Sequence, residues 1–316
     1  MSQMVMYVAF VGGLVLIIKG GDWFVDAASY VAEASGVPKF VVGATVVSFA
    51  TTLPELMVSS LAMMQGKVDM ALGNIVGSVT VNTSFILPLS ILFLSVSVKR
   101  KDNFNLKVLL FLLSEIVLFA ISLTRGASMV KSLALVVMFI LYIIENIHSA
   151  KKKNEPNDEL AKDQKTIILN LAKFFVGLFG IVYGSRLLVD NGSEIARSLG
   201  ISEAFIALTA ISIGTSLPEL VTAVSAIIKK EAALSVGNIF GANTLDIVMI
   251  IPVCSFIANK TQGVPLPISE MTVIRDLPVC IAVSLVATIP TMIKGKFYKW
   301  QGVLLLVMYG AYLTLL

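Results

Sequence analysis

Ten stretches of about twenty mostly apolar residues follow one another along the chain, and they limit the possible folds more than any other feature. A helix of that length spans the hydrocarbon core of a bilayer. Of the 316 residues, 57% are hydrophobic and 14% are charged, and the mean hydropathy is +0.90. Soluble domains carry about 25% charged residues, so this chain is expected to have lipid as its solvent. The predicted spans cover residues 4–33, 40–64, 69–96, 105–123, 128–147, 167–198, 204–228, 232–258, 272–292 and 299–316.

A long polar segment, HSAKKKNEPNDELAKDQK at 148–165, divides the chain into a first repeat at 1–147 and a second at 166–316. Of the 24 Lys and Arg residues, 16 belong to one set of alternate loops and six to the other. Loops rich in Lys and Arg stay in the cytoplasm, so we predict a cytoplasmic linker and two outside termini. The predicted location is the cell membrane, with the lipid bilayer around a multi-pass protein.

The two halves align without a gap when the chain is shifted by 164 residues. Leu53-Pro54-Glu55-Leu56 matches Leu217-Pro218-Glu219-Leu220, and Gly73-Asn74-Ile75 matches Gly237-Asn238-Ile239. Five spans per half is an odd number, so the second half enters the membrane from the opposite side. Inverted repeats with broken helices are an architecture of secondary transporters. We therefore predict an all-α membrane protein of ten transmembrane helices, in two inverted five-helix repeats with broken helices at the midplane.

The repeated motif, TTLPEL at 51–56 and TSLPEL at 215–220, places oxygen atoms at the centre of the membrane. Pro54 and Pro218 have no backbone N–H to donate, so the helix is expected to kink or unwind there and to free a carbonyl. Hydroxyl, amide and carboxylate groups surround the two prolines, from Thr51, Thr52, Glu55, Asn74, Asn82, Thr215, Ser216, Glu219, Asn238 and Asp246. Such hard oxygen ligands suit Ca²⁺ and also Na⁺. A single copy would suggest only a kink with back-bonded hydroxyls, whereas two copies favour a binding site.

The charged residues inside the spans need partners. A carboxylate at the bilayer centre costs on the order of 3 kcal/mol, which a bound cation or a proton would offset. We predict structural ion pairs for Lys19 with Asp22 and for Arg186 with Asp190, and Glu115 in the fourth span stays unassigned. One His and two Cys are too few for a transition-metal site. No cofactor and no nucleic-acid partner is predicted, and the expected state is a monomer.

The motifs resemble those of the cation/calcium antiporter superfamily, specifically its sodium/calcium exchanger branch. The resemblance rests on GATVVSFATTLPEL and GNIVGSVTVN in the first half, and on ALTAISIGTSLPEL and GNIFGANTLD in the second. It covers nearly the whole chain and implies an antiporter, not an enzyme, that exchanges Ca²⁺ for Na⁺ by alternating access. Calcium/proton exchangers of this superfamily typically carry Gly-Asn before the glutamate, where this chain has Leu-Pro.

The same resemblance implies a set of ion ligands. The calcium site would use Glu55 and Glu219 with the backbone carbonyls of Thr51 and Thr215. One sodium site would use Ser216, Ser78 and the Ser212 carbonyl; its mate would use Thr52 and the Ser48 carbonyl; Asn82 and Asp246 would form a midplane polar pair. Because the same carboxylates would serve both ions, Ca²⁺ and a full Na⁺ load would exclude each other. The first and sixth spans are implied to slide as a pair over the other eight.

The chain departs from the family pattern at three positions. Ala242 stands where a serine often mirrors Ser78, Thr52 stands where serine is usual, and Ala50 where glycine is usual. One sodium site is therefore expected to be weakened or absent. The residues leave open a Ca²⁺/H⁺ exchanger and a K⁺-dependent Na⁺/Ca²⁺ exchanger. An intramembrane acid hydrolase with paired carboxylates, or a passive channel, would lack coupled ion exchange.

Overall fold

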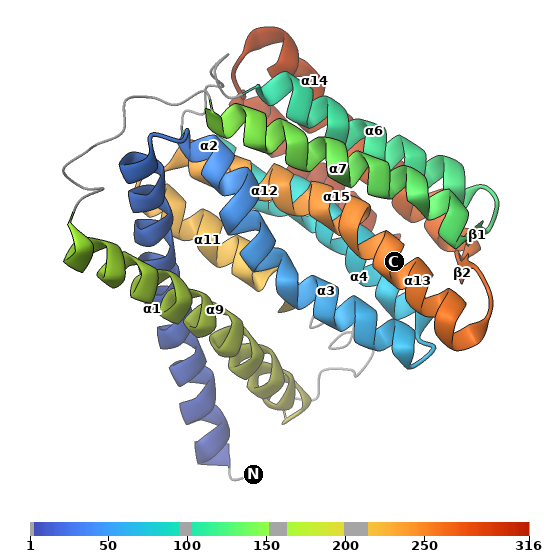
Figure 1. Ribbon diagram of the computed structural model, residues 1–316. Helices are drawn as coiled ribbons and strands as arrows, with labels where there is room; N and C mark the ends of the chain where they lie inside the picture. The colour runs from blue at the N-terminus through green and yellow to red at the C-terminus, as the bar shows by residue number, and fades with distance from the viewer. Residues whose placement is uncertain (1–2, 95–102, 152–162, 199–213, 316) are drawn as a thin grey trace.

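The computed structural model describes residues 3–94, 103–151, 163–198 and 214–315, and it is almost entirely helical (Figure 1). The helical segments of the first half are α1 (Gln3–Ser35), α2 (Lys39–Val42), η1 (Gly43–Val47), α3 (Ser48–Met64), α4 (Val68–Val81), η2 (Asn82–Ile86), α5 (Leu87–Phe93), α6 (Phe104–Ser122) and α7 (Met129–Lys151). Those of the second half are α9 (Gln164–Ser198), α11 (Leu217–Ile228), α12 (Ala232–Leu245), η4 (Asp246–Ile250), α13 (Ile251–Gln262), η5 (Thr272–Asp276), α14 (Leu277–Lys294) and α15 (Lys299–Leu313). They join into ten runs that match the predicted spans where these are described; residues 204–213 of the seventh predicted span, 204–228, lie outside the described residues. Eight of the runs are long and apolar enough to cross a membrane, counted over the described residues.

Three π-helical segments have a common cause in the sequence. Pro88, Pro252 and Pro278 each lie two residues beyond the end of a π segment, η2, η4 and η5 respectively. A proline cannot bond the carbonyl four residues before it, and its ring crowds that carbonyl. A π turn absorbs the lost register without ending the helix. η2 and η4 are related by the same 164-residue shift as the sequence, so the repeat extends to this backbone irregularity.

The two motif prolines have different effects. Pro218 lies in the first turn of α11, and Ser216 before it is in a turn, so the helix is interrupted there as expected. Pro54 lies inside α3, which continues from Ser48 to Met64. Of the two outcomes expected at Pro54, a kink or unwinding, unwinding does not occur. A proline removes one hydrogen bond and bends a helix, but packing on all sides can hold the helix together.

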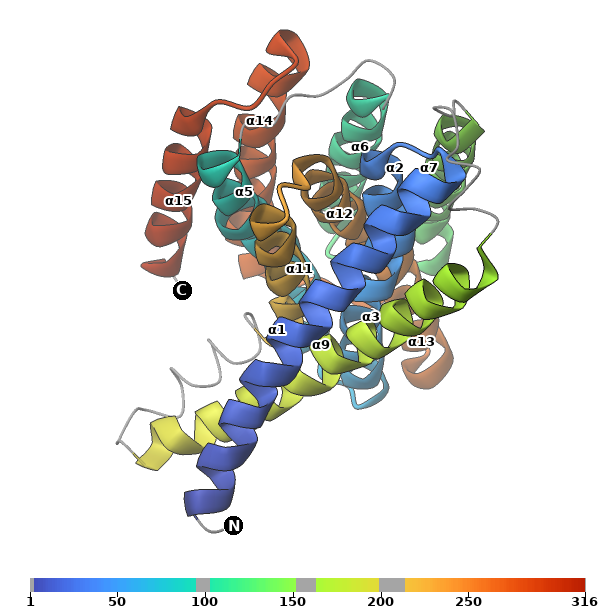
Figure 2. The same cartoon turned by 90° about the vertical axis from the view of Figure 1, so that its left-hand side faces the viewer.

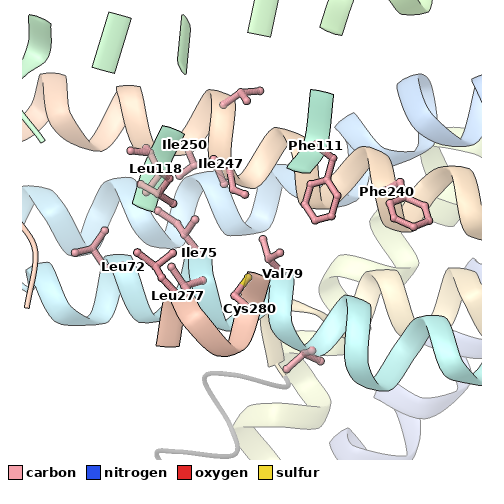
Figure 3. Close-up of a cluster of buried hydrophobic side chains, with 14 of the residues drawn as sticks. Leu72, Ile75, Val79, Phe111, Leu118, Phe240, Ile247, Ile250, Leu277 and Cys280 are labelled. Carbon is pink, nitrogen blue, oxygen red and sulfur yellow. The ribbon is translucent and has the colours of Figure 1, made fainter. Parts of the chain in front are cut away.

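The most buried runs lie at the centre of the bundle. They are the run from α4 to α5 and the run from α12 to α13, one from each half. Figure 3 shows apolar side chains of α4, α6, η4 and α14 packed in one cluster, which includes Ile75, Leu118, Ile247 and Leu277. All four are at most 2% exposed. The two halves thus share one core and are not separate folding units.

Helices α1 and α9 form a pair on the outside of the bundle (Figure 2). Their backbones are in contact where they cross: a Cβ atom added at Gly20 would lie only 2.7 Å from the Gly177 carbonyl oxygen. Most contacts of α1 are with α9, and its contacts with the remaining helices are mainly with α11 and α2. The ion pairs predicted inside these helices, Lys19–Asp22 and Arg186–Asp190, are wrong: neither forms within the described ranges, and Asp22 instead lies 3.7 Å from Lys229.

Loops from the two halves meet at the ends of the bundle. β1 (Gly126–Ala127) pairs antiparallel with β2 (Leu266–Pro267), and Arg125 lies 3.2 Å from Glu270 beside them. Both loops belong to the set with few basic residues. Lys39 and Glu231, from two loops of the basic set, form an ion pair with a 2.6 Å Nζ–Oε1 distance. Each described contact therefore joins loops that the inverted topology places on the same side.

Candidate functional site

Helix α3, which carries the first motif, packs against the Gly-Asn helices of both halves, α4 and α12. Helix α11, which carries most of the second motif, packs against α12 of its own half and against η2 and α5 of the first half. The approach of α2 and η1 to α12 requires glycine, because a Cβ atom at Gly237 would lie 2.2 Å from the Phe40 carbonyl oxygen. A Cβ atom at Gly43 would lie 2.4 Å from the Leu234 carbonyl oxygen. These glycines bring polar side chains of opposite halves within reach of one another.

Two hydrogen bonds between the halves are related by the internal repeat. The Thr51 hydroxyl donates to Asn238 Oδ1 at 3.2 Å, and the Thr215 hydroxyl donates to Asn74 Oδ1 at 2.9 Å. Thr51 and Thr215 are related by the 164-residue shift, and so are Asn74 and Asn238, so each bond is the repeat counterpart of the other with donor and acceptor on opposite halves. Asn74 Nδ2 also donates to Ser59 Oγ at 2.9 Å and to the Glu55 carbonyl at 3.4 Å. The asparagines therefore hold the motif threonines of the opposite half in position.

A second symmetric pair of hydroxyl positions is only half preserved. The Ser216 hydroxyl lies 3.3 Å from the Ser78 hydroxyl, and both side chains are buried. The repeat mates of these residues are Thr52 and Ala242, which are also buried. Thr52 Oγ1 has no hydrogen-bond partner in the described part of the chain. Thr52 thus has an alanine, Ala242, at the position that corresponds to Ser78, the hydroxyl partner of Ser216.

Three carboxyl groups interact at the centre of the molecule. Glu55, Glu219 and Asp246 are each 1% exposed. Glu55 interacts electrostatically with the other two, and the Thr51 hydroxyl lies close to Glu219. All four oxygens of the two glutamates, and Oδ1 of Asp246, accept no hydrogen bond from the described residues. Water is scarce at this depth, so oxygens in this state are suited to a cation or a proton.

Asn82 and Asp246 occupy equivalent positions, each at the first residue of a π segment. Both are 1% exposed, and the Oδ1 atom of each lacks a hydrogen-bond partner within the described ranges. π segments inside helices are frequent at functional sites, because they turn a side chain or a carbonyl away from its regular position. Both residues of the predicted midplane pair are thus buried, and each has one oxygen atom that could bind a cation or a proton.

The predicted ligands are placed as follows. Nine of the eleven are buried, at no more than 2% exposure: Ser48, Thr51, Thr52, Glu55, Ser78, Asn82, Ser216, Glu219 and Asp246. Thr215 is half-buried, and Ser212 lies outside the described residues. No group of three or more His, Cys, Asp or Glu side chains in the described ranges is arranged to hold a metal ion. Carboxylates alone therefore do not complete a coordination sphere, and hydroxyl, amide and carbonyl oxygens would have to contribute.

Two buried polar residues were not part of the predicted site. The Tyr142 hydroxyl donates to the Ala44 carbonyl, inside η1. A π segment leaves carbonyls without their usual donor, so a tyrosine reaching from α7 satisfies one of them. Glu115 of α6 accepts hydrogen bonds on Oε1 from Ser284 at 2.7 Å and from Cys280 at 3.4 Å, both on α14. Neither residue has a polar repeat mate, so the repeat gave no signal for them.

Comparisons with known proteins agree with this architecture. The family model described as sodium/calcium exchanger protein matches residues 5–147 and 169–316, one match for each repeat. The inner membrane protein YrbG of Escherichia coli is 33% identical over 315 residues, covering 92% of this chain and 94% of that protein. The sodium/calcium exchanger MaX1 of Methanosarcina acetivorans is 28% identical and covers 96% of both chains.

A solved structure has the same fold along its entire length. The sodium-calcium exchanger NCX_Mj, in crystals soaked with Na⁺ and Sr²⁺, superposes with a TM-score of 0.86 and 28% identity, covering 100% of both chains. The all-helical fold, the ten helices and the two repeated halves predicted from the sequence are thereby confirmed. This chain belongs to the sodium/calcium exchanger family, and it is a membrane antiporter of the Na⁺/Ca²⁺ exchanger type, not an enzyme.

Proposed function

We propose that the chain exchanges Ca²⁺ for Na⁺ at one site between its halves, with Glu55 and Glu219 as the calcium ligands. The observation that carries this proposal is the pair of buried glutamates from opposite halves, whose carboxylates repel each other and whose four oxygens accept no hydrogen bond from the described residues. Ca²⁺ takes 6–8 oxygens, typically from carboxylates, backbone and amide carbonyls and water. The backbone carbonyls of Thr51 and Thr215 would complete the site, since Asn238 and Asn74 fix both threonines.

Sodium would bind on either side of the calcium position. Ser216 and Ser78, whose hydroxyls lie 3.3 Å apart, together with the Ser212 carbonyl, would form one sodium site. Thr52 and the Ser48 carbonyl would form the other, near Asn82 and Asp246. Each sodium site would share a glutamate with the calcium site, so the binding of one ion type disfavours the other. Mutual exclusion of this kind makes transport an exchange and prevents net leakage.

Alternating access would come from movement of α1 and α9 across the other helices. The pair contacts the rest of the bundle over a limited area, mainly at α11 and α2. Glycine contacts hold α1 and α9 together, as at Gly20 and Gly177. A pair that is tightly joined internally and lightly joined to its neighbours can move as one body. Its displacement would uncover the central site first on one side of the membrane and then on the other.

The proposed membrane placement has the 148–165 linker in the cytoplasm and both termini outside, in the cell membrane. The distribution of basic residues supports this orientation, with 16 of 24 in the cytoplasmic set of loops. The β1–β2 pairing supports the grouping of loops into two sides. We propose a monomer, because a single chain supplies both glutamates and both asparagines.

The test is ion flux in vesicles that contain the purified protein. An outward Na⁺ gradient should drive Ca²⁺ uptake, which should stop when Na⁺ is equal on both sides. The pH gradient and K⁺ are clamped in the first measurement and varied in the next two. Uptake that follows a pH gradient and ignores Na⁺ would make the protein a Ca²⁺/H⁺ exchanger. Uptake that needs K⁺ would make it K⁺-dependent, and ion flux without any coupling would indicate a channel.

A further inference from the structure

Carboxylates of α1 form ion pairs with lysines of the neighbouring helices. Lys229 Nζ lies 2.6 Å from Asp26 Oδ1 and 3.7 Å from Asp22 Oδ1. Lys39 Nζ lies 2.8 Å from Glu33 Oε1 and 2.6 Å from Glu231 Oε1. We call these six residues the α1 network. In it, three carboxylates of α1 are held by two lysines that belong to the rest of the bundle.

The α1 network lies at one end of the interface between α1 and the other helices. Asp22 and Asp26 are one helical turn apart, so both face Lys229 just after the end of α11. Glu33 is near the end of α1, and Lys39 begins α2. Both lysines are in loops of the basic set, so all the pairs gather on the proposed cytoplasmic side. The contact of Gly21 with the Val221 and Ser225 side chains is close packing and contains no ion pair.

We propose that the α1 network is a latch, which holds the α1–α9 pair in the position seen here and opens when the pair moves. The proposal rests on the proposed function, which requires that movement. Smooth apolar contacts allow many neighbouring positions, whereas ion pairs with fixed partners select one position. Lys229 and Lys39 are positioning residues in this scheme, because they act through α1 and not on the ions.

The exposure of the lysines suits a latch that opens repeatedly. The Lys229 side chain is 24% exposed and the Lys39 side chain 28%. A fully buried ion pair is very costly to separate, and a fully exposed one contributes almost nothing. Partly wetted pairs lie between these limits. They can hold a position and still be replaced by water within a transport cycle.

The repeat does not reproduce the Lys229 part of the latch at the opposite end. Asp26 corresponds to Asp190 in the second half, but Lys229 corresponds to Gln65, whose amide cannot form the ion pair that Lys229 forms with Asp26. The repeat mates of Glu33, Lys39 and Glu231 are Arg197, Glu203 and Lys67, so the charges of the Lys39 part are reversed in the second half. The Lys229 part of the latch should therefore favour the arrangement seen here over its inverted counterpart.

A distance measurement tests the latch without any transport assay. Spin labels on Tyr7→Cys of α1 and Val303→Cys of α15, both exposed positions, report the separation of the α1–α9 pair from the bundle by electron paramagnetic resonance. The double variant Lys39→Gln/Lys229→Gln should shift the distance distribution toward a second population. The control is Arg125→Gln, which breaks the Arg125–Glu270 pair far from α1 and should shift nothing. Identical distributions in the double variant and the parent would overturn the proposal.

Transport measurements on variants test whether the latch affects the rate of ion exchange. We expect Lys229→Gln to change exchange turnover about two- to fivefold, while the Ca²⁺ affinity measured by calorimetry stays the same. The swapped pair Asp26→Lys/Lys229→Asp should restore parental turnover, and Lys229→Arg should retain it. Turnover unaffected by Lys229→Gln, or a swap that fails to restore it, contradicts the latch. If the parent shows no Na⁺-driven Ca²⁺ uptake, the proposed function fails, and the spin-label distances still decide the latch.

Discussion

A buried carboxyl group can be stabilised by hydrogen bonds, by a counter-charge or by a bound cation, and the buried acids of this protein differ in which they have. Glu115 accepts two hydrogen bonds from α14 on one oxygen. Glu55 and Glu219 accept none within the described ranges, although they are equally buried. The burial of an acid therefore does not identify a transport ligand. What distinguishes the two glutamates is that none of their oxygens accepts a hydrogen bond within the described residues, whereas Glu115 accepts two on Oε1.

This difference predicts that glutamine substitution impairs Ca²⁺ binding at Glu55 and Glu219 but not at Glu115. Glu55→Gln and Glu219→Gln should each weaken Ca²⁺ binding by more than about 100-fold, because removing one charged partner in a buried site costs about 3–5 kcal/mol. Ca²⁺-driven exchange should disappear in both. Glu115→Gln, at similar burial, keeps a hydrogen-bonding side chain and should bind Ca²⁺ within about threefold of the parent, which is within 1 kcal/mol. Calorimetry in detergent measures all three, and equal losses in all would contradict the assignment.

The missing hydroxyl at Ala242 predicts a gain of function. By the repeat, a serine there would face the Thr52 hydroxyl, which has no hydrogen-bond partner among the described residues, in the way that Ser78 faces Ser216. One added oxygen ligand contributes about 1 kcal/mol, so Ala242→Ser should lower the Na⁺ concentration for half-maximal exchange about threefold to fivefold. Ser78→Ala should raise it by a similar factor. Na⁺ titrations of Ca²⁺ efflux measure both changes, and an unchanged midpoint in Ala242→Ser would show that Thr52 is not a sodium ligand.

Sequence reasoning identified the proposed ligands that the repeat marks twice and missed the buried polar residues that occur once. Glu55 and Glu219 stood out because the same motif appears at a fixed spacing in both halves. Tyr142 and Glu115 have no polar mate, so only the packing of α7 on η1 and of α6 on α14 reveals their partners. Asp22 was assigned to its helical neighbour Lys19, but its partner Lys229 is about 200 residues away in sequence. Local spacing cannot predict such a contact.

At the scale of the helices, the fold depends on close approach at a few glycines and on π segments at prolines. α12 lies against α2 and η1 with almost no space between the backbones at Gly237. Pro88 and Pro252 set the π segments that begin at Asn82 and Asp246. The sequence predicted irregular helices near the midplane, but not that the irregularity would be π-helical. The continuity of α3 through Pro54 could not be predicted, because it depends on packing around the helix.

Gly237→Ala tests the close approach. The new Cβ atom would overlap the Phe40 carbonyl, which belongs to a helix and cannot move without displacing its neighbours. Overpacking of this kind typically costs about 1–3 kcal/mol, so the melting temperature in detergent should fall by several degrees. Gly310→Ala is the matched control, since a Cβ atom there meets nothing within 4 Å. Equal melting temperatures for both variants and the parent would show that α12 can shift away from α2 at no cost.

At the scale of the whole molecule, the inverted repeat predicts which loops of the two halves lie on the same side of the membrane. Contacts between loops can be compared with that prediction. The β1–β2 pair and the Lys39–Glu231 pair each join a loop of one half to a loop of the other. Odd numbers of spans per half and the gapless alignment were enough to predict this arrangement. Which side is the cytoplasm does not follow from the fold, because a folded bundle has the same internal contacts in either orientation. That assignment depends on the basic residues alone.

Labelling of loop cysteines in intact cells tests the orientation. Lys67→Cys lies in an exposed loop predicted outside, and Lys296→Cys lies in an exposed loop predicted inside. A maleimide that cannot cross membranes should label Lys67→Cys in intact cells and Lys296→Cys only after permeabilisation. The native Cys254 and Cys280 are buried and should stay unlabelled in both conditions. The reverse pattern would place the basic loops outside, and the latch formed by Lys39 and Lys229 would then act on the external side.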